Sequence, residues 1–549
     1  MVSQSNLLSA LHRYWGYDSF LPRQEKIVTS LLEGHDSCVI MPTGGGKSLC
    51  YQLPATMLPD RTVIVISPLI ALMQDQVAQL EQIGIPAAFL NSSLKGAQQT
   101  QVVRKACTGH YRLLYLSPER LARADTIDWL KRVPVALFAI DEAHCISEWG
   151  HEFRPEYRQL SRLKEHFPDR PIAAFTASAT QHVRHDIVEQ LHLHDPHKYI
   201  ASFHRKNLRY TVQQCTGETQ LDLLVKALRA HPGESAIVYS PTIKRVGETV
   251  SLLERQGIHA TPYHGKMETS ARRASQERWT ADEVRVLVGT LAFGLGINKA
   301  AVRAVIHLSL PKSVEQYYQE AGRAGRDGEP ADCLLLWQKR DEGLLAHFIG
   351  QINDVAEKER AWQRYFGIKQ FAESKRCRHR QICEYFGENM KAESCHACDV
   401  CGGLPEWMPK PDAAKPPIQK VAASGSVSGY VGSRQQKLPQ MRVSSSEVDP
   451  ELREFLREWR QAAAREQGVP AFVVMHDTSL DDLCRKRPRS VAELLHVHGF
   501  GERKTQTYGT KIVEALNRFR NGARAGQAPE KPAKPARRWA AAAGVGRRS

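Results

Sequence analysis

The sequence has no apolar run of the roughly 18 consecutive residues that a membrane-spanning helix needs. Its opening segment, MVSQSNLLSALHRYWGYDSF, lacks the layout of a secretory signal peptide. Cysteine accounts for only 12 of 549 residues, too few for a disulfide scaffold in a chain of this length. These absences exclude a membrane protein and predict a cytoplasmic chain that is not secreted.

Composition and charge point to a large, basic globular protein. Hydrophobic residues make up 42% and charged residues 24%, which excludes a wholly disordered chain. At roughly 100–200 residues per domain, the length predicts three or four domains. Lysine and arginine outnumber the acids by 75 to 59, a net charge of +16. Large basic proteins commonly bind polyanions, so nucleic acid is the first partner that the charge suggests.

Short apolar runs recur along the chain, and many end in a polar or glycine-rich signature. Continuous Val/Ile/Leu/Ala runs separated by helical patterns indicate parallel strands covered on both faces. We therefore expect an α/β fold with two tandem parallel-sheet domains and with functional residues beyond the carboxyl ends of the strands. The first series is SCVIMPTGGGKS, TVIVISPLIAL, YRLLYLSPERL, VALFAIDEAH and PIAAFTASAT, and the second is SAIVYSP, RVLVGT, AVRAVIHLSLP and ADCLLLW.

Changes in pattern divide the chain into six expected regions. The fourth has six prolines, four glycines and seven serines in 45 positions, which is typical of a flexible linker. The last has seven Lys/Arg and one Glu. The regions are two α/β domains (1–200 and 201–340), a charged helical segment that ends in a cysteine cluster (341–402), the linker (403–447), an all-α domain (448–521) and a basic disordered tail (522–549).

The first apolar run leads into the segment PTGGGKS, which precedes a helical pattern. Glycines in such a loop let backbone N–H groups wrap phosphates, the lysine neutralises the β/γ-phosphate charge, and the serine hydroxyl can bind Mg²⁺. The strict pattern has Gly or Ala where this chain has Met41, and the alternative is a glycine-rich loop that binds nothing. We expect ATP to be held by Thr43, Gly44, Gly45, Gly46, Lys47 and Ser48.

Asp141, Glu142, Ala143 and His144 follow another buried run. There Asp141 is expected to hold Mg²⁺ together with Ser48, and Glu142 to orient or deprotonate the attacking water. A lone acidic pair at a strand end is otherwise a solvated loop. Together with the glycine-rich loop, the pair predicts nucleotide hydrolysis.

Four further segments, SPLIALMQDQV, TASAT, VGTLAFGLGINK and QEAGRAGRDG, follow in the order found in superfamily 2 helicases. Arg323 and Arg326 lie three residues apart on one helix face. Either can therefore reach a γ-phosphate across a cleft between the two α/β domains. Structural ion pairing is the alternative for both arginines.

Four segments of the sequence resemble the RecQ family of DNA helicases. They are MPTGGGKSLCYQLPA, DEAHCISEWGHEFRPEY, AFGLGINK and YYQEAGRAGRDG. The resemblance covers about residues 10–402 and resumes over 448–521, which look like the family's HRDC module. It implies two RecA-like domains and an ATP-dependent helicase that moves 3′ to 5′ on single-stranded DNA and unwinds tailed duplexes or forks in repair and recombination. It also implies a catalytic role for Gln319 beside the two arginines.

The loop Ser147–Tyr157 is the most specific part of this resemblance, because RNA helicases with a DEAH box have no equivalent run. In the family this aromatic-rich loop contacts single-stranded DNA and signals its presence to the ATP site. Aromatics suit that role because stacking is worth roughly 1–3 kcal/mol per base, whatever the base. The implied DNA contacts are Trp149, His151, Phe153 and Arg154, with Phe472 in the HRDC module. The alternatives are an interdomain core for the loop and core packing for Phe472.

The segment GYDSFLPRQ resembles the family's adenine-reading motif. The resemblance implies that Tyr17 stacks on the adenine and that Gln24 hydrogen-bonds its edge, as a bidentate amide can. The family usually has Arg at the position of Leu21 and Gly at that of Arg23. We expect these departures to affect selectivity for ATP more than its use.

Four cysteines, spaced C-x17-C-x2-C-x2-C, match the family's zinc-binding subdomain: Cys377, Cys395, Cys398 and Cys401. Four thiolates suit tetrahedral Zn²⁺ in a closed, structural site. An iron–sulfur cluster and plain buried thiols are the alternatives. The resemblance gives the ligand role to Cys377 and not to Cys383.

Most family members have a winged helix after the zinc-binding subdomain. The linker in its place here is too short and too poor in strand pattern for that domain. Two other functions therefore stay open: an RNA helicase, and a DNA-binding or annealing protein whose ATPase only changes its affinity. The expected partner is DNA, in the nucleoid of a bacterium or the nucleus of a eukaryote.

Overall fold

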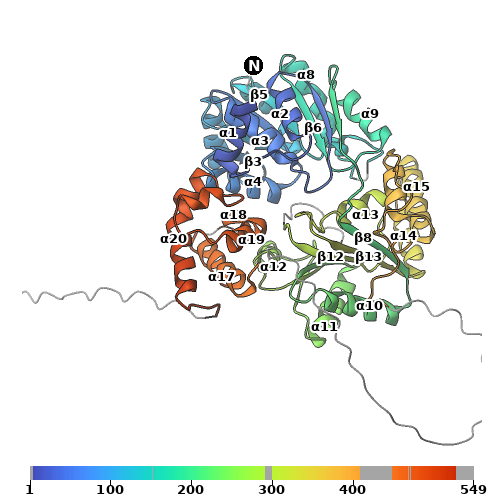
Figure 1. The fold of residues 1–549 in the computed structure, drawn as a ribbon. Helices are drawn as coiled ribbons and strands as arrows, with labels where there is room; N and C mark the ends of the chain where they lie inside the picture. Colours follow the sequence, from blue (N-terminus) through green and yellow to red (C-terminus); the bar gives the residue numbers. More distant parts are fainter. Residues whose placement is uncertain are drawn as a thin grey trace, which may run out of the picture.

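The computed structural model describes residues 4–150, 152–290, 299–408, 448–467, 469 and 471–526. Figure 1 shows a sheet-containing domain at the top, a second one below it, and C-terminal helices that lie against both. Most of the expected linker (409–447) and most of the basic tail (527–549) lie outside the described residues. Within the described ranges, no helix is long and apolar enough to cross a membrane.

Domain 1 is built on a seven-stranded parallel sheet in the order β3-β4-β2-β5-β6-β1-β7. Its strands are β1 (Ser37–Ile40), β2 (Thr62–Ile66), β3 (Ala87–Leu90), β4 (Leu113–Leu116), β5 (Val135–Ile140), β6 (Ile172–Thr176) and β7 (His197–Ile200). Its α-helices are α1 (Gln4–Trp15), α2 (Gln24–Leu32), α3 (Lys47–Met57), α4 (Ile70–Gln82), α5 (Gly96–Cys107), α6 (Pro118–Leu121), α7 (Ala124–Leu130), α8 (Arg162–His166) and α9 (Gln181–Gln190). Two 3₁₀ helices, η1 (Ala143–Ile146) and η2 (Pro155–Ser161), lie between β5 and α8.

Domain 2 repeats this plan with a six-stranded parallel sheet in the order β10-β11-β9-β12-β13-β8. Its strands are β8 (Leu208–Gln214), β9 (Ser235–Tyr239), β10 (Ala260–Tyr263), β11 (Val286–Gly289), β12 (Val302–His307) and β13 (Ala331–Trp337). Its helices are α10 (Gly217–Ala230), α11 (Ile243–Arg255), α12 (Thr269–Thr280) and α13 (Val314–Ala321). The two sheets confirm the expected α/β fold with tandem parallel-sheet domains.

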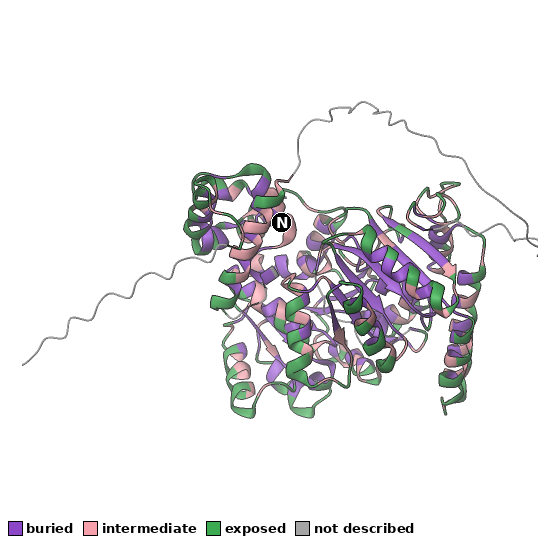
Figure 2. Ribbon diagram, turned by 90° about the horizontal axis from the view of Figure 1, so that it is seen from below, coloured by how far each residue is buried: buried purple, intermediate pink, exposed green. Residues whose placement is uncertain are grey.

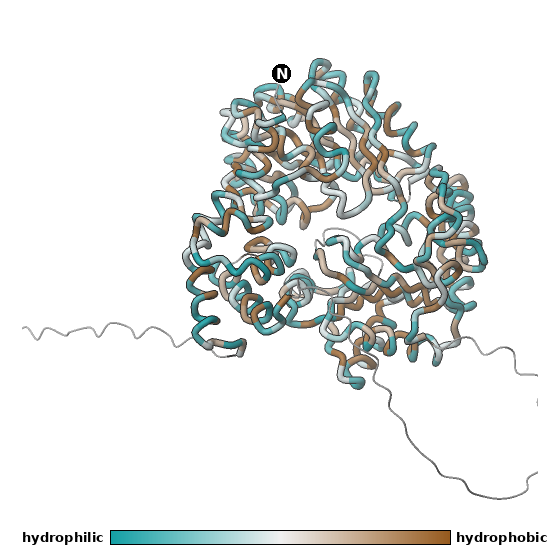
Figure 3. Tube along the Cα trace, viewed as in Figure 1, coloured by the Kyte–Doolittle hydropathy of each residue, from teal (hydrophilic) through white to brown (hydrophobic). Residues whose placement is uncertain are grey.

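The interior strands are almost wholly buried, as their purple colour in Figure 2 shows, and they carry much of the hydrophobic sequence (Figure 3). Helices cover both faces, so each interior strand is an unbroken apolar run that sequence inspection detects. The strands that the apolar runs did not predict are β3, β7, β8 and β10, and these are the four edge strands. An edge strand has a single neighbour and keeps exposed positions, as in β7 and β8, so its pattern is mixed.

A helical segment follows domain 2, with α14 (Arg340–Gly350), α15 (Val355–Glu373) and α16 (Arg378–Tyr385). The loop after α16 pairs with the edge strand β8, because Tyr210 and Cys398 form an isolated parallel bridge. The C-terminal helical domain contains α17 (Pro450–Gln467), α18 (Ala471–Val474), α19 (Asp477–Lys486), η3 (Glu493–His496) and α20 (Glu502–Arg520). Its core is a cluster of its own, separate from those of the two sheets.

The C-terminal helical domain contacts domain 1 through hydrogen bonds, a ring stack and the ion pair of Arg13 with Glu502 at 3.3 Å. The N–H of Gly499 donates to the carbonyl of Gly16 at 3.1 Å, and the Tyr508 hydroxyl donates to Gln82 Oε1 at 2.8 Å. A Cβ on Gly16 would lie 2.4 Å from the carbonyl carbon of Phe500, so only glycine permits this approach.

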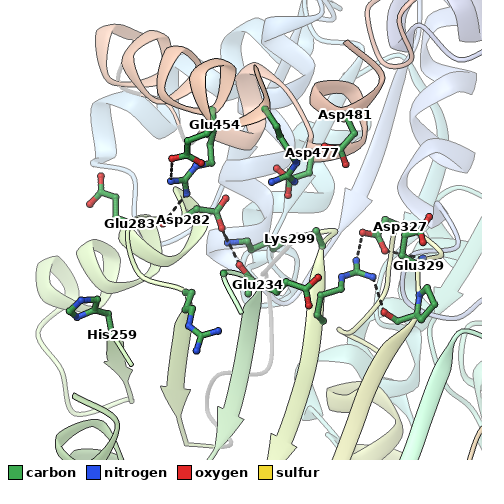
Figure 4. A pocket seen from close by; sticks show the side chains of 18 of the residues that line it. Glu234, His259, Asp282, Glu283, Lys299, Asp327, Glu329, Glu454, Asp477 and Asp481 are labelled. Carbon is green, nitrogen blue, oxygen red and sulfur yellow. Dashed lines mark hydrogen bonds and ion pairs between the residues drawn. The ribbon is translucent and has the colours of Figure 1, made fainter. Parts of the chain in front are cut away.

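The same domain contacts domain 2 through charged groups. Arg465 pairs with Glu283 at 2.7 Å, and Arg457 donates to the Asp282 carbonyl at 3.0 Å. A cavity of about 710 Å³ lies between the two domains, lined by acidic and basic side chains (Figure 4). Most of its carboxylates already have a cationic partner, such as Asp282 with Lys299 at 2.5 Å. We therefore interpret the cavity as part of a domain interface, and not as a ligand site.

Candidate ATP site and nucleic-acid interface

The glycine-rich loop lies between β1 and α3, at the carboxyl edge of the first sheet. Gly44 and Gly46 have φ angles of 85° and 75°, in the left-handed region that glycine adopts without strain. A Cβ on Gly46 would lie 2.2 Å from Gln24 Nε2, so a side chain there would displace the end of Gln24. The loop's open backbone is the kind that wraps phosphates with N–H groups.

Lys47 begins α3 and folds back over this loop. Its Nζ donates to the Met41 carbonyl at 3.0 Å and lies 3.5 Å from the Pro42 carbonyl. Removal from water lowers the pKa of Lys47, while the charges of Glu142 and Asp141 act in the opposite direction. The ammonium therefore lies in the electrostatic field of Asp141, which is expected to bind magnesium, and of Glu142, which is expected to orient the attacking water.

Asp141 and Glu142 follow β5, as the sequence predicts for this acidic pair. Burial and the neighbouring Glu142 raise the pKa of Asp141 to about 7, and Lys47 opposes that shift. Glu142 has a φ of 47°, a left-handed conformation that costs a non-glycine residue roughly 1–3 kcal/mol and is common at functional sites. The Tyr157 hydroxyl donates to the Asp141 carbonyl at 2.9 Å and helps to hold this turn. The Asp141 carboxylate and the Ser48 hydroxyl are oxygen donors of the type that Mg²⁺ prefers.

Of the two candidate arginines, Arg326 lies at the phosphate loop. Its Cβ and Cγ lie 3.4 Å from the place that a Cβ on Gly44 would take. Burial, together with the charges of Arg323 and Arg205, lowers the pKa of Arg326 to about 9. Arg323 is buried within domain 2, next to Tyr239. Burial raises the pKa of Tyr239, and the charge of Arg323 and a hydrogen bond with it act in the opposite direction. By spacing alone, either arginine could reach a γ-phosphate, and the structure places Arg326, and not Arg323, at the phosphate loop.

The adenine-reading segment is held between the phosphate loop and the C-terminal helical domain. Gln24 is buried and donates from Nε2 to the Gly46 carbonyl at 3.1 Å. The Tyr17 ring stacks on His498, with centroids 4.8 Å apart and an angle of 26°. Arg23 has a φ of 74°, a conformation that favours the glycine usual in the family. Leu21 is 49% exposed, so the position at which the family has Arg faces solvent.

The aromatic-rich loop places Trp149 on the surface, with 48% of the residue exposed. Its ring meets His182 edge-on at 4.8 Å, and the guanidinium of Arg360 in α15 lies 5.8 Å from its centre. Phe153 is half-buried under Arg158, at 5.2 Å. The exposure of Trp149 does not fit the alternative of a loop that only fills a core.

For the three other expected DNA contacts, the structure gives a backbone hydrogen bond of Arg154 and does not describe the side chains of His151 and Phe472. The backbone N–H of Arg154 donates to the Cys145 carbonyl at 2.9 Å, which fixes the loop's return to the DEAH segment. His151 lies outside the described residues. Phe472 belongs to α18, but its side chain is not among those described, so its two interpretations stay open.

A chain of polar contacts leads from the aromatic-rich loop to the second domain. A Cβ on Gly150 would lie 2.6 Å from the His144 carbonyl, so the loop packs directly on the DEAH segment. His144 Nδ1 lies 2.8 Å from Thr176 Oγ1, whose hydroxyl donates to the Ser178 carbonyl at 3.0 Å. Gln319 in α13 donates to Ser178 Oγ at 2.8 Å. The TASAT segment is recognisable as a motif from the sequence, but its spacing does not show that it connects the DEAH segment to Gln319.

The four predicted zinc ligands come together, since the Sγ atoms of Cys377, Cys395, Cys398 and Cys401 all lie within 4.8 Å of one another. Backbone N–H groups approach two of these sulfurs at 3.4 Å, as they do for thiolates. Burial raises the pKa of the Cys401 thiol, but hydrogen bonds outweigh burial and lower it to about 7. Four closely spaced thiols suit a tetrahedral, structural zinc ion.

Comparison with known proteins gives four family-model matches, in chain order. They are DEAD/DEAH box helicase (residues 21–186), helicase conserved C-terminal domain (219–328), RecQ zinc-binding (339–402) and HRDC domain (449–516). Among solved structures, Mss116p bound to single-stranded RNA and AMP-PNP aligns with a TM-score of 0.52 and 17% identity, over 70% of this chain and 90% of that one. At this identity the likeness shows the fold alone.

Curated relatives are more similar in sequence, and two of them align over 93% of this chain. The ATP-dependent DNA helicase RecQ of Haemophilus influenzae is 43% identical over 401 residues, which cover 73% of this chain and 64% of that relative. The protein of the same name from Pasteurella multocida is 34% identical over 93% of this chain and 94% of its own length, and that from Bacillus subtilis is 33% identical over 93% and 98%. With a phosphate loop, a DEAH segment, four clustered cysteines and relatives aligned almost end to end, the chain belongs to the RecQ family of helicases.

Proposed function

We propose that this protein is an ATP-dependent DNA helicase that moves 3′ to 5′ on single-stranded DNA and unwinds tailed duplexes and forks, with roles in repair and recombination. ATP, bound together with Mg²⁺, is hydrolysed to drive movement, and Zn²⁺ stabilises the segment after domain 2. The observation that carries the proposal is the chain of contacts from the aromatic-rich loop through His144 and Ser178 to Gln319. Such a connection lets DNA on one side of the DEAH segment change the geometry of the ATP site on the other.

Residues from both domains divide the reaction between them. The phosphate loop and Lys47 bind the triphosphate, Asp141 and Ser48 hold magnesium, and Glu142 orients the water. Arg326 approaches from domain 2 and stabilises charge only when the two domains are close, which couples hydrolysis to closure. Separation and closure of the domains then alternate their grip on the DNA backbone.

A strand-displacement assay tests the whole proposal. Forked and 3′-tailed duplexes should be unwound with ATP and Mg²⁺, and should stay intact with a non-hydrolysable analogue or with a 5′ tail alone. Single-stranded DNA should stimulate ATP hydrolysis more than RNA of the same length. DNA-stimulated hydrolysis without strand displacement would instead support a binding or annealing protein, and stimulation by RNA alone would support an RNA helicase.

Substituting Trp149 with alanine is expected to preserve basal ATP hydrolysis and to remove most of its stimulation by single-stranded DNA. A stacked base worth roughly 1–3 kcal/mol shifts the loop between two states by about one to two powers of ten. Phe153→Ala is expected to act in the same direction. The measurement is ATP turnover with and without a saturating oligonucleotide, together with the melting temperature.

Phe348→Ala is a matched control, because Phe348 in α14 is exposed to the same 48% but lies outside the loop. It should keep full stimulation. If Trp149→Ala is stable and is stimulated as strongly as the wild type, the loop does not sense DNA. A joint fall in melting temperature and basal turnover would indicate that the ring only supports the fold.

A further inference from the structure

Arg205 occupies the connection between β7 and β8, where the chain passes from domain 1 to domain 2. Its Nη1 donates to the carbonyl of Thr43 in the phosphate loop at 3.0 Å and lies 3.5 Å from that of Gly322. Its Nη2 donates to the carbonyls of Ala324 at 3.2 Å and Gly325 at 2.9 Å. One planar guanidinium therefore joins the phosphate loop to the turn that carries Arg326.

These four acceptors are all backbone carbonyls, and that determines what the side chain can do. A trans peptide is planar, so its N–H points away from its C=O. By holding the Thr43 carbonyl, Arg205 sets the direction of the Gly44 N–H, one of the donors that the loop offers to phosphate. By holding the Gly325 carbonyl, it also fixes the orientation of the peptide group that joins Gly325 to Arg326.

The opposite side of the turn is fixed independently of domain 1. The N–H of Arg326 donates to the Ala300 carbonyl at 3.2 Å, and that of Gly325 to the Val302 carbonyl at 2.9 Å. Asn207 donates to the Gly325 and Glu329 carbonyls at 2.8 and 2.9 Å, and both contacts lie within domain 2. Arg205 is thus the side chain of this connection that extends from the turn to the phosphate loop.

We propose that Arg205 is a positioning residue for ATP hydrolysis, which aligns the phosphate loop of domain 1 with the Arg326 turn of domain 2. It touches neither the water nor the phosphate in this role, and acts through Thr43 and Gly325. The inference rests on the proposed ATPase function and assigns to Arg205 the geometric link between its two halves. A guanidinium suits the task because its rigid fork offers several donors at once, which a lysine ammonium on a flexible stem does not.

The first test is the steady-state kinetics of ATP hydrolysis in Arg205→Ala and Arg205→Lys. A small displacement of catalytic groups costs roughly 10²-fold in rate, so we expect kcat to fall by about that factor in Arg205→Ala. KM for ATP should change much less, because the groups that bind the triphosphate ground state remain. Arg205→Lys should stay well below the wild type although it keeps the positive charge. Full rescue by lysine would show that the charge alone matters and would overturn the proposal.

The second test separates alignment from stability. ADP with aluminium fluoride mimics the transferred phosphoryl group, so its affinity relative to ADP alone reports engagement by both domains. Arg205→Ala should lose this preference while ADP binding persists, whereas Lys206→Ala, which removes an exposed cation of the same connection, should keep both the preference and kcat. A normal preference in Arg205→Ala, with kcat reduced only as its melting temperature falls, would refute the inference. A wild-type protein without ATPase activity would refute the proposed function itself.

Discussion

Lys47→Ala is expected to reduce ATP turnover by about 10²–10³-fold or more, the usual cost of removing a group that stabilises charge in the transition state. The amine lies over the phosphate loop and is the expected partner of the β/γ-phosphates. Its loss also acts on Asp141, since Lys47 lowers a pKa that already stands at about 7. Without that cation, the carboxyl that is expected to hold magnesium loses a neighbouring positive charge that opposes the upward shift of its pKa.

ATPase assays at saturating single-stranded DNA give the measurement, with DNA binding followed separately by fluorescence anisotropy. Lys95→Ala, an exposed lysine at the start of α5, is the control and should hydrolyse ATP normally. DNA binding by Lys47→Ala should be largely preserved, because Lys47 is expected to contact the nucleotide and is not one of the expected DNA contacts. Wild-type turnover in Lys47→Ala would remove the basis for the ATP site.

Cys398→Ser is expected to lower both the zinc content and the yield of soluble protein. Its side chain is 1% exposed and its backbone pairs with Tyr210 on β8, so loss of the metal frees this loop from the edge of the second sheet. Zinc contributes an apparent folding free energy of roughly 10–16 kcal/mol in isolated finger peptides, and less where a larger core exists, as here. Elemental analysis should find about one zinc per wild-type chain and much less in the variant.

Cys383→Ala is the matched control, because this buried cysteine lies in the same segment but outside the cluster of four. It should keep its zinc even where repacking lowers its melting temperature. A visible absorption band of iron and sulfide in the wild type would show that the cluster holds a different centre. Normal zinc content in Cys398→Ser would remove that residue from the ligand set.

The parts of the fold and site that depend on local sequence were predictable. Buried parallel strands such as β2 and β5 are continuous apolar runs, and the phosphate loop, the DEAH segment and the cysteine cluster are short motifs. Each requires residue types whose chemistry is evident without knowledge of distant partners. The edge strands were not predicted, because their residues are only partly buried and their pairing depends on tertiary neighbours.

Contacts between distant segments were not predictable by the same reasoning. The expected helix face for the two arginines is wrong, because α13 ends at Ala321 and both residues lie in the turns that follow it. Their spacing made them equivalent, and only the packing of domain 2 brings Arg326 to the phosphate loop and leaves Arg323 beside Tyr239. Arg205 lies 162 positions from Thr43, and nothing local marks its side chain as a link. The stacking of His498 on Tyr17 likewise joins opposite ends of the chain.

The C-terminal helical domain is attached to both of its neighbours by hydrogen bonds and exposed ion pairs, and to domain 1 also by ring stacking. Its contact with domain 1 combines the stacking of His498 on Tyr17, a backbone hydrogen bond and the exposed ion pair of Arg13 with Glu502 at 3.3 Å. Its contact with domain 2 includes the ion pair of Arg465 with Glu283, whose side chains are 71% and 36% exposed. Salt shortens the screening length from about 10 Å at 0.1 M to about 3 Å at 1 M, and so weakens exposed ion pairs while leaving stacking largely intact. High salt is therefore expected to weaken the ion pairs of both contacts while the stacking of His498 on Tyr17 persists, so the attachment of the C-terminal helical domain depends in part on the electrolyte.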